Sequence, residues 1–185
     1  MMDSYYYETD ALATGLGVGF MLLFYAIFFI VYIAIWIAME YPLYRMAKRQ
    51  GMSNAWLAYI PFGNFYITLK LSPREFNLFN WFKYENRTKA FWLFLIATGI
   101  YIVLMVPMIL IFTFIPVLGW LLYIAYILAY LAVCYGIMWR MNYDLLITYG
   151  MPEHAMWASI VNIFFPLLMY VFYYIIMNKE PDMNA

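Results

Sequence analysis

The stretch that decides the fold runs from Ala90 to Trp139 and reads AFWLFLIATGIYIVLMVPMILIFTFIPVLGWLLYIAYILAYLAVCYGIMW, without one charged residue. At about 1.5 Å per residue, a helix of this length would extend roughly 75 Å, whereas the hydrocarbon core of a bilayer is about 30 Å thick. The stretch must therefore cross a membrane, turn and cross back. We expect spans at 90–113 and 119–139, joined by a hairpin at 114–118.

The composition of the whole chain also indicates an integral membrane protein. Of its 185 residues, 68% are hydrophobic and 11% are charged, against roughly 45–50% and about 25% in soluble domains. Such a chain has too little polar surface to cover itself in water. Ten-residue segments of alternating polarity, which are typical of transmembrane β-barrels, are not seen. The sequence therefore predicts an all-α, polytopic membrane helical bundle that forms one domain over 1–185.

Two further apolar runs are long enough to cross the bilayer. The run at 11–39 is longer than the usual 20 residues, so the first span is tilted or projects beyond the bilayer. The run at 155–177 is expected to be the last span, although Asn162 and Pro166 lie within it. With the two spans of the central stretch, the sequence predicts about four transmembrane helices.

The run at 55–69 is apolar but short, and Pro61, Gly63 and Asn64 interrupt it. A short, broken run is more often a re-entrant or interfacial hairpin than a span. A broken element can free backbone groups to bind an ion or a substrate. The alternative is a tight turn between two interfacial half-helices.

The segment at 41–50 combines basic and apolar residues. Arg45, Lys48 and Arg49 alternate with leucine, tyrosine, methionine and alanine. Long basic side chains can lay their stems on apolar surface while their charges reach lipid head groups. We therefore expect an interfacial helix that stops at Gly51, with the three basic residues contacting head groups.

A second interfacial helix is expected after Ser72. Ser72, Pro73 and Glu75 have the spacing of a helix cap, first helical residue and capping box. The helix would carry the aromatic residues of 76–83 along the head-group level. The polar segment at 141–154, which follows the third span, is predicted to be a connection.

The basic residues favour one orientation in the membrane, because inside loops are enriched in Lys and Arg. If the amino terminus lies outside and 55–69 does not cross, nine of the ten basic residues lie inside. These nine are Arg45, Lys48, Arg49, Lys70, Arg74, Lys83, Arg87, Lys89 and Arg140. If 55–69 crossed, only the first three would lie inside. The sequence thus predicts a multi-pass protein of the cell (cytoplasmic) membrane with its amino terminus outside.

The chain contains a faint internal repeat. Tyr32–Trp36, Arg45-Met46, Gly51-Met52 and Trp56 recur as Tyr126–Tyr130, Arg140-Met141, Gly150-Met151 and Trp157. Both copies would begin on spans that run from outside to inside, so an internal duplication would be parallel. Chance similarity in so biased a composition is the alternative.

The block Arg45-Met-Ala-Lys-Arg-Gln-Gly-Met-Ser-Asn-Ala-Trp-Leu-Ala-Tyr-Ile-Pro-Phe-Gly-Asn64 resembles a block in a group of small multi-pass membrane proteins of unknown function from Gram-positive bacteria. Those proteins also have a later Ile-Pro motif, similar to Ile115-Pro116-Val117-Leu118-Gly119 here, and end in an apolar segment. The resemblance covers roughly a third of the chain. It implies a bacterial cytoplasmic membrane and no known activity.

Few residues are candidates for catalysis. Membrane enzymes use paired carboxylates, a His-rich metal set, or a Ser or Cys nucleophile with a base. The one histidine, His154, follows Glu153 on the same side as Asp144. The solvated start of the last helix explains this pair better, because Pro152 suits a first turn. The alternative is a membrane enzyme that uses the inside-facing Glu153 and His154. Cys134 lies in an apolar run, so we expect no enzyme and no catalytic, cofactor-binding or metal-binding residues.

The distribution of charge also bears on transport. Transporters and pumps place ionisable residues at membrane depth, whereas the apolar runs here carry none inside, and only Glu40 and Arg140 lie at span ends. This pattern argues against proton-coupled transport. It leaves open a pore lined by backbone carbonyls or neutral polar groups.

The first span contains Gly15 and Gly19, a small-xxx-small pair that lets helices approach closely. Methionine-rich, aromatic surface adapts to irregular partners, and a net charge of zero points away from nucleic acid. We therefore expect a non-enzymatic subunit or accessory protein of a larger membrane assembly, with a membrane protein or a second copy as partner. The alternative is a small channel or transporter for a neutral or apolar substrate.

Overall fold

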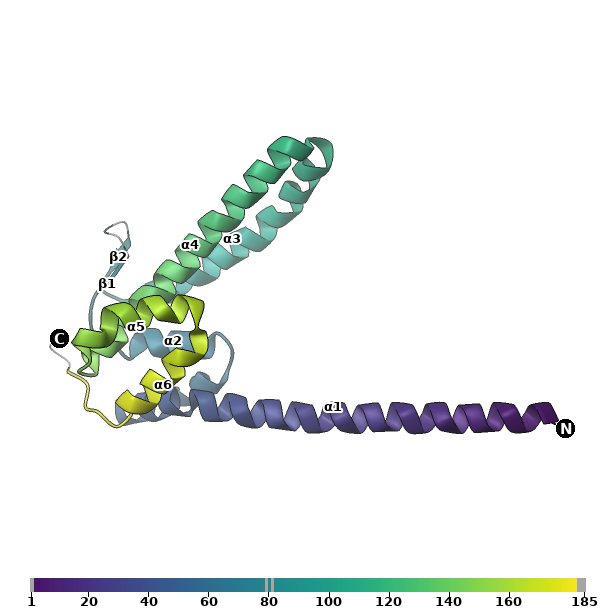
Figure 1. Cartoon of the computed structure of the whole chain (residues 1–185). Helices are drawn as coiled ribbons and strands as arrows, with labels where there is room; N and C mark the ends of the chain where they lie inside the picture. Colours follow the sequence, from purple (N-terminus) through teal and green to yellow (C-terminus); the bar gives the residue numbers. More distant parts are fainter. Residues whose placement is uncertain (1, 79, 81, 183–185) are drawn as a thin grey trace. The chain divides into compact units, whose positions relative to one another are not determined.

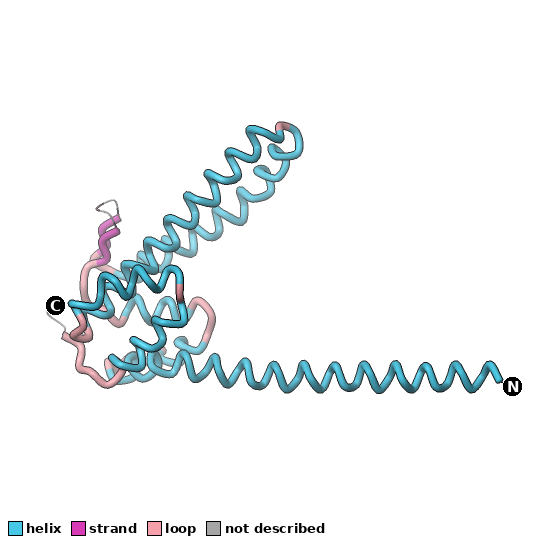
Figure 2. The backbone as a smooth tube through the Cα atoms, viewed as in Figure 1, coloured by secondary structure: helices cyan, strands magenta, loops and turns pink. Residues whose placement is uncertain are grey.

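The computed structural model describes residues 2–78, 80 and 82–182, and helices dominate this part of the chain (Figure 1, Figure 2). In order, the elements are α1 (Met2–Arg49), the 3₁₀ helix η1 (Ala55–Tyr59), α2 (Gly63–Lys70), β1 (Phe76–Leu78), β2 (Phe82–Tyr84), α3 (Arg87–Phe114), α4 (Pro116–Thr148), α5 (Pro152–Phe164) and α6 (Pro166–Ile176). The chain divides after Met39 into two compact units, so α1 contributes residues to both.

Three helices are long and apolar enough to cross a membrane. They contain the segments Gly15–Arg49, Arg87–Ile111 and Val117–Thr148, with mean hydropathies of 2.6, 2.6 and 2.2 in their most apolar windows. The prediction of a helical membrane protein is confirmed at this level.

The first unit consists of the amino-terminal part of α1. Every residue from Gly15 to Ile35 is exposed, on all sides of the helix. A helix that is apolar all round needs an apolar environment along its whole surface. The bilayer supplies one, so this unit is suited to cross a membrane.

The helices α3 and α4 form an antiparallel hairpin, as the sequence predicted for the charge-free stretch (Figure 1). Pro116 begins α4 directly after Ile115, whose amide donates a hydrogen bond of 2.9 Å to the carbonyl of Ile111. Aromatic rings join the two helices, because Tyr101 stacks on Tyr126 and Tyr130 with ring centroids 5.0 and 4.0 Å apart.

The polar connection predicted at 141–154 is wrong over most of its length, because α4 continues to Thr148. Arg140 and Asp144 are four residues apart on this helix and form an ion pair, which stabilises a further helical turn. Leu145 and Leu146 are fully buried beside them. The end of α4 is therefore part of the core rather than a loop.

The predicted single helix at 155–177 is also divided, into α5 of 13 residues and α6 of 11 residues. Phe165 separates them with a non-helical backbone, φ −131° and ψ 75°. The following Pro166 explains this break, since proline lacks an amide hydrogen and disfavours helical geometry in the residue before it. Neither helix reaches the roughly 20 residues that a span requires.

The helix predicted after Ser72 is wrong, because this segment contains an antiparallel β-hairpin of β1 and β2. Phe76 and Leu78 are buried, and Asn77 between them is partly exposed, which is the two-residue period of a strand. Asn80 makes the turn with a left-handed φ of 60° and donates its amide to the Asn77 side chain at 2.9 Å. Phe79 and Trp81, which the predicted helix included, lie outside the described residues.

The predicted interfacial helix at 41–50 is continuous with the first span, since α1 extends to Arg49. Gly51 then stops the helix with a φ of +74°, a conformation that glycine adopts without strain. The basic residues thus extend a long helix instead of forming a separate one.

The segment at 55–69 forms a compact turn of η1 followed by α2. At Gly63, a Cβ atom would lie 2.3 Å from the carbonyl oxygen of Leu57. Only glycine fits such a contact, so this residue permits η1 and α2 to fold back on each other.

The core of the second unit is built around the ends of α1 and α4. Its buried residues are Leu43, Met46, Ala47, Ala55, Ala58, Ile67, Leu71, Leu145, Leu146, Tyr149, Ala155, Ala158, Met169, Phe172, Tyr173 and Ile176. The helices α2, α5 and α6 therefore pack on the two long helices at this end.

The ends of α1 and α4 share one capping geometry. Gly51 and Gly150 both have positive φ, of 74° and 72°. The next residue, Met52 or Met151, donates its amide to a carbonyl five residues back at 3.0 or 2.9 Å, as in a Schellman motif. This similarity falls on the predicted repeat, but a common cap can arise independently, so duplication stays a prediction.

Candidate functional site: buried carboxylates and a polar hollow

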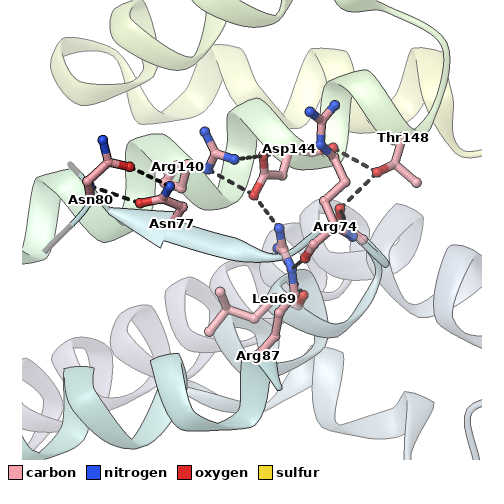
Figure 3. Close-up of polar contacts among 9 residues, drawn as sticks. Leu69, Arg74, Asn77, Asn80, Arg87, Arg140, Asp144 and Thr148 are labelled. Atoms are coloured by element: carbon pink, nitrogen blue, oxygen red, sulfur yellow. Dashed lines mark hydrogen bonds and ion pairs between the residues drawn. The ribbon is translucent and has the colours of Figure 1, made fainter. Parts of the chain in front are cut away.

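Asp144 lies at the centre of a cluster of three arginines (Figure 3). Its carboxylate pairs with Arg87 from the start of α3 and, at 3.0 Å, with Arg140 from α4. Arg74 from the loop before β1 lies 3.8 Å away. The side chain of Asp144 has no exposed surface, whereas Arg74 and Arg140 are partly exposed. Three guanidinium groups and one carboxylate leave the cluster with two surplus positive charges.

Arg87 also binds backbone oxygens. Its Nε donates to the carbonyl of Arg74 at 2.6 Å and its Nη1 to the carbonyl of Leu69 at 3.2 Å. The same guanidinium lies 5.9 Å from the ring centre of Phe76. All of its nitrogens therefore have partners, and the cluster ties α2, the β-hairpin and α3 to the end of α4.

Glu40 is a second buried carboxylate, on the part of α1 that belongs to the second unit. Its side chain is fully buried, and its Oε1 accepts hydrogen bonds of 2.9 Å from Asn64 Nδ2 and Tyr170 OH. Its Oε2 is buried without a hydrogen-bond partner. Within the described residues, no Lys or Arg nitrogen lies within ion-pair distance of Glu40. This carboxylate is thus held by neutral groups alone.

A polar hollow of about 200 Å³ lies among α1, α2, α4, α5 and α6. Its lining residues are Leu43, Asn64, Phe65, Thr68, Met138, Met141, Asn142, Asn162, Pro166, Met169, Tyr170 and Tyr173. Both residues that bind Glu40 belong to this wall. Glu40 itself does not line the hollow, so the carboxylate supports this wall from behind, through Asn64 and Tyr170.

Two helix ends meet at the polar hollow. Asn64 is the second residue of α2, and Asn162 lies near the end of α5. Asn162 is 5% exposed and its Oδ1 has no hydrogen-bond partner. Pro166, four residues later, has no amide hydrogen to donate to the backbone carbonyl of Asn162. The break between α5 and α6 thus places polar groups in the wall of the hollow.

A third polar contact joins the ends of α1 and α4 to the carboxyl-terminal tail. Arg49 donates to the carbonyl of Met177 at 3.0 Å and pairs with Glu180. Gln50 donates to the hydroxyl of Tyr149 at 3.1 Å. Burial, with a smaller contribution from Glu180, raises the pKa of Tyr149 to about 12 against the opposing effects of the hydrogen bond from Gln50 and the charge of Arg49. These contacts hold the tail beside α1.

The residues predicted for helix packing and for head-group contact lie outside the polar hollow. Gly15 and Gly19 belong to the first unit, and nothing lies within 4 Å of a Cβ atom built on either. Arg45 and Lys48 are exposed, as head-group contact requires, whereas Arg49 binds the tail.

The residues considered for catalysis do not form a constellation. Glu153 and His154 lie exposed in the first turn of α5, and His154 Nδ1 accepts a hydrogen bond of 3.4 Å from Trp157. Asp144 is occupied by arginines instead. Among the described residues, no three His, Cys, Asp or Glu side chains are grouped as metal ligands.

Sequence reasoning missed the two buried carboxylates. The apolar pattern places Glu40 at the end of a span and Asp144 in a connection. The spacing of four residues between Arg140 and Asp144 is the local signal that the helix continues. Asn64, Pro61 and Gly63 had been singled out as a broken element. Of these three, Asn64 lines the polar hollow, Gly63 permits the tight turn, and Pro61 lies in the loop between η1 and α2.

Comparison with known proteins adds no relative, since no protein-family model, curated protein or solved structure matches the chain.

Proposed function

We propose that this chain is a non-enzymatic subunit of a larger membrane assembly, and that the first span of α1 docks against a transmembrane helix of a partner protein. The observation that carries this proposal is the exposure of the first unit. From Gly15 to Ile35 every residue is exposed, so no neighbouring element of the same unit covers this apolar helix.

The glycines of this span support a helix rather than lipid alone as the neighbour. A glycine inside a helix costs roughly 1 kcal/mol relative to alanine. Gly15 and Gly19 lie about one turn apart with open space around them, so within their unit they serve no contact. Small residues four apart let two membrane helices approach until their backbones touch. A partner helix would pack against the flat surface at Gly15 and Gly19, where no side chain holds it away from the backbone.

We further propose three spans, with the amino terminus outside and the second unit at the inner surface of the cytoplasmic membrane. The tail supports this topology. The amide of Asp182 donates to the carbonyl of Thr148 at 2.7 Å, and Arg49 binds the carbonyl of Met177. If α5 and α6 return to the side on which α4 ends, Lys179 joins the other basic residues and all ten lie inside, as the positive-inside bias favours.

The second candidate function is a small channel or transporter, and the polar hollow is the observation that favours it. Broken helices that meet at buried polar groups form the binding sites of many transporters. A self-contained transporter predicts uptake of a solute by the purified protein in liposomes. A subunit predicts no uptake without its partner.

The non-enzymatic part of the proposal rests on the lack of a nucleophile–base pair around His154 in the described residues. Changing Glu153 and His154 together to Gln should leave accumulation in the membrane and cellular function unchanged. Loss of function with normal accumulation would favour an enzyme.

The docking part is tested by purification from the native membrane in mild detergent. Gly15→Leu with Gly19→Leu should release the partner while the protein stays inserted and resistant to protease. Gly99→Leu is the matched control, because Gly99 is also an open glycine on a span but lies on α3. Release by both changes, or by neither, would contradict docking through α1.

A further inference from the structure

The cluster around Asp144 contains hydrogen-bond donors that the protein does not use. The side chain of Arg74 makes no hydrogen bond to a described residue, because its one charge contact, to Asp144, is 3.8 Å long. Arg140 uses its Nε and Nη2 on Asp144, which leaves its Nη1 without a partner in the same part of the chain. The two arginine side chains are partly exposed, at 28% and 19%. Since a guanidinium carries five N–H donors, an anion can still bind here.

Arg74 and Arg140 approach one point from different elements. Both lie near the same oxygen of Asp144, Oδ1, at 3.8 and 3.0 Å, so their guanidinium groups are neighbours (Figure 3). Glu75, the residue after Arg74, pairs with Lys83 instead. Guanidinium groups bind the oxygens of a phosphate with two parallel hydrogen bonds. A phosphate group therefore matches both the unused donors and the surplus positive charge.

The cluster lies where the hairpin of α3 and α4 leaves the bilayer. The charge-free stretch of the hairpin runs from Ala90 to Trp139, and Lys89 and Arg140 flank it directly. From Ala90 to Phe114, α3 extends roughly 36 Å at about 1.5 Å per residue, which is enough to cross a hydrocarbon core of about 30 Å. The arginines thus lie at the level of the head groups, where the available phosphates belong to lipids.

An apolar groove on α4 starts beside the cluster and follows the helix toward the bilayer interior. Its volume is about 280 Å³, and its lining residues are Ala132, Tyr135, Gly136 and Trp139 of α4 with Ile160 and Ile163 of α5. Trp139 stacks on Tyr143 with ring centroids 5.9 Å apart. The guanidinium of Arg140 lies 5.5 Å from the centre of the same Tyr143 ring. These two contacts connect the groove with the cluster, and an acyl chain suits its apolar wall.

We propose that an anionic phospholipid binds at this end of α4, with one acyl chain in the apolar groove between α4 and α5 and its phosphate bound by Arg140 and Arg74. Basic sites between membrane helices bind anionic lipid head groups in this manner. The site requires only that α3 and α4 cross the membrane. It therefore rests neither on the docking of α1 nor on the orientation of the chain.

The test uses native mass spectrometry of the full chain in mild detergent, with dioleoyl phosphatidylglycerol as the probe. We expect a saturable adduct of one lipid per chain. Dioleoyl phosphatidylcholine has the same acyl chains and a phosphate but no net charge, and it should bind at least about tenfold more weakly, as the loss of a charge-assisted contact implies. Glycerol 3-phosphate supplies the phosphate without acyl chains and should not displace the lipid at equal concentration. Displacement would assign the site to a soluble phosphate and overturn the proposal.

Two pairs of variants locate the head group and the acyl chain. Arg74→Gln removes a guanidinium that makes no hydrogen bond in the cluster, and it should weaken phosphatidylglycerol binding about tenfold. Lys83→Gln removes an exposed charge of the neighbouring hairpin and should bind as wild type does.

Ala132→Trp fills the groove from an exposed position and should also weaken binding. Ala129→Trp, at an exposed alanine of α4 that does not line the groove, is the matched control. Unfolding midpoints of all four variants should stay close to wild type, because the pairs of Asp144 with Arg87 and Arg140 remain. The proposal is overturned if both lipids bind equally, if Arg74→Gln and Lys83→Gln bind alike, or if Ala132→Trp binds as Ala129→Trp does.

Discussion

Arg87, the first residue of α3, pairs with Asp144, which lies one turn before the end of α4, so a buried ion pair joins the two helices at the open end of their hairpin. Removing one member of a buried pair leaves an uncompensated charge in the interior. The pair is therefore a sensitive point for the stability of the second unit.

We expect Asp144→Asn to lower the free energy of unfolding by about 3–5 kcal/mol, because Arg87 would keep its charge at 5% exposure without a counter-ion. Thermal unfolding in detergent measures the effect. Glu75→Gln breaks the exposed pair with Lys83 and should cost about 1 kcal/mol or less. Equal losses in the two variants would mean that the Asp144 cluster does not hold the core together.

Two glycines should respond in opposite ways to the same change. Gly63→Ala places a Cβ atom 2.3 Å from the Leu57 carbonyl, and we expect a loss of about 1–3 kcal/mol from the overpacking. Gly99→Ala meets nothing within 4 Å on α3 and should be neutral or stabilising by up to about 1 kcal/mol. Unfolding midpoints of the two variants compare them directly. A stable Gly63→Ala protein would show that η1 and α2 are not folded back as described.

Labelling of single cysteines should separate three spans from four. In a variant without the native cysteine, new cysteines at Tyr5 and Val117 should react with an impermeant reagent on intact cells. Those at Lys48, Glu85 and Glu180 should react only after permeabilisation. Position 180 decides between the two topologies, because a full span at 155–177 would place it outside. Labelling of Glu180→Cys on intact cells would contradict the contact between the tail and Arg49.

The sequence predicted the long helices because the bilayer leaves few alternatives for apolar runs. It placed the ends of α1 and α4 too early, at Met39 and Trp139 instead of Arg49 and Thr148. Burial of Asp144 depends on Arg74, Arg87 and Arg140, which lie 70, 57 and 4 residues away in the chain. Only the spacing to Arg140 is short enough to be recognised as a helical ion pair in the sequence. The charges of Arg140 and Asp144 therefore suggest a loop. In the structure their ion pairs allow α4 to continue into the core.

Two local patterns predict a different structure from the one observed, each for its own reason. The segment after Ser72 has a helix-start spacing, but Phe76 and Leu78 are buried with a period of two, and packing against α4 overrides the local preference. The last apolar run is hydrophobic enough to predict one continuous helix. Hydropathy does not reflect that Pro166 has no amide hydrogen for the backbone carbonyl of Asn162, and the helix breaks there. The polar hollow depends on the second feature, because Asn162 and Pro166 line it on either side of the break between α5 and α6.

Alkaline pH should destabilise the protein partly through Tyr149. Its pKa is raised to about 12 in the folded state by burial, against about 10 in an unfolded chain. The unfolded state therefore loses its proton first, and the stability that Tyr149 contributes falls as the pH rises from about 10 to about 12. Tyr149→Phe should be less stable than wild type by about 1 kcal/mol at pH 8, since it loses the hydrogen bond from Gln50. The gap should narrow or reverse by pH 11, as unfolding midpoints would show. A constant gap would contradict the buried position of the hydroxyl.

Photo-crosslinking in native membranes tests the proposed docking of α1 most directly. Leu22 lies on the same helix face as Gly15 and Gly19, seven and three residues away, whereas Phe28 lies on the opposite face. A photoreactive residue at Leu22 should yield one protein adduct of defined mass, containing a partner other than this chain. The same residue at Phe28 should yield lipid adducts only. Protein adducts at neither position, equal adducts at both, or an adduct of two copies of this chain would contradict a subunit that docks through its first helix.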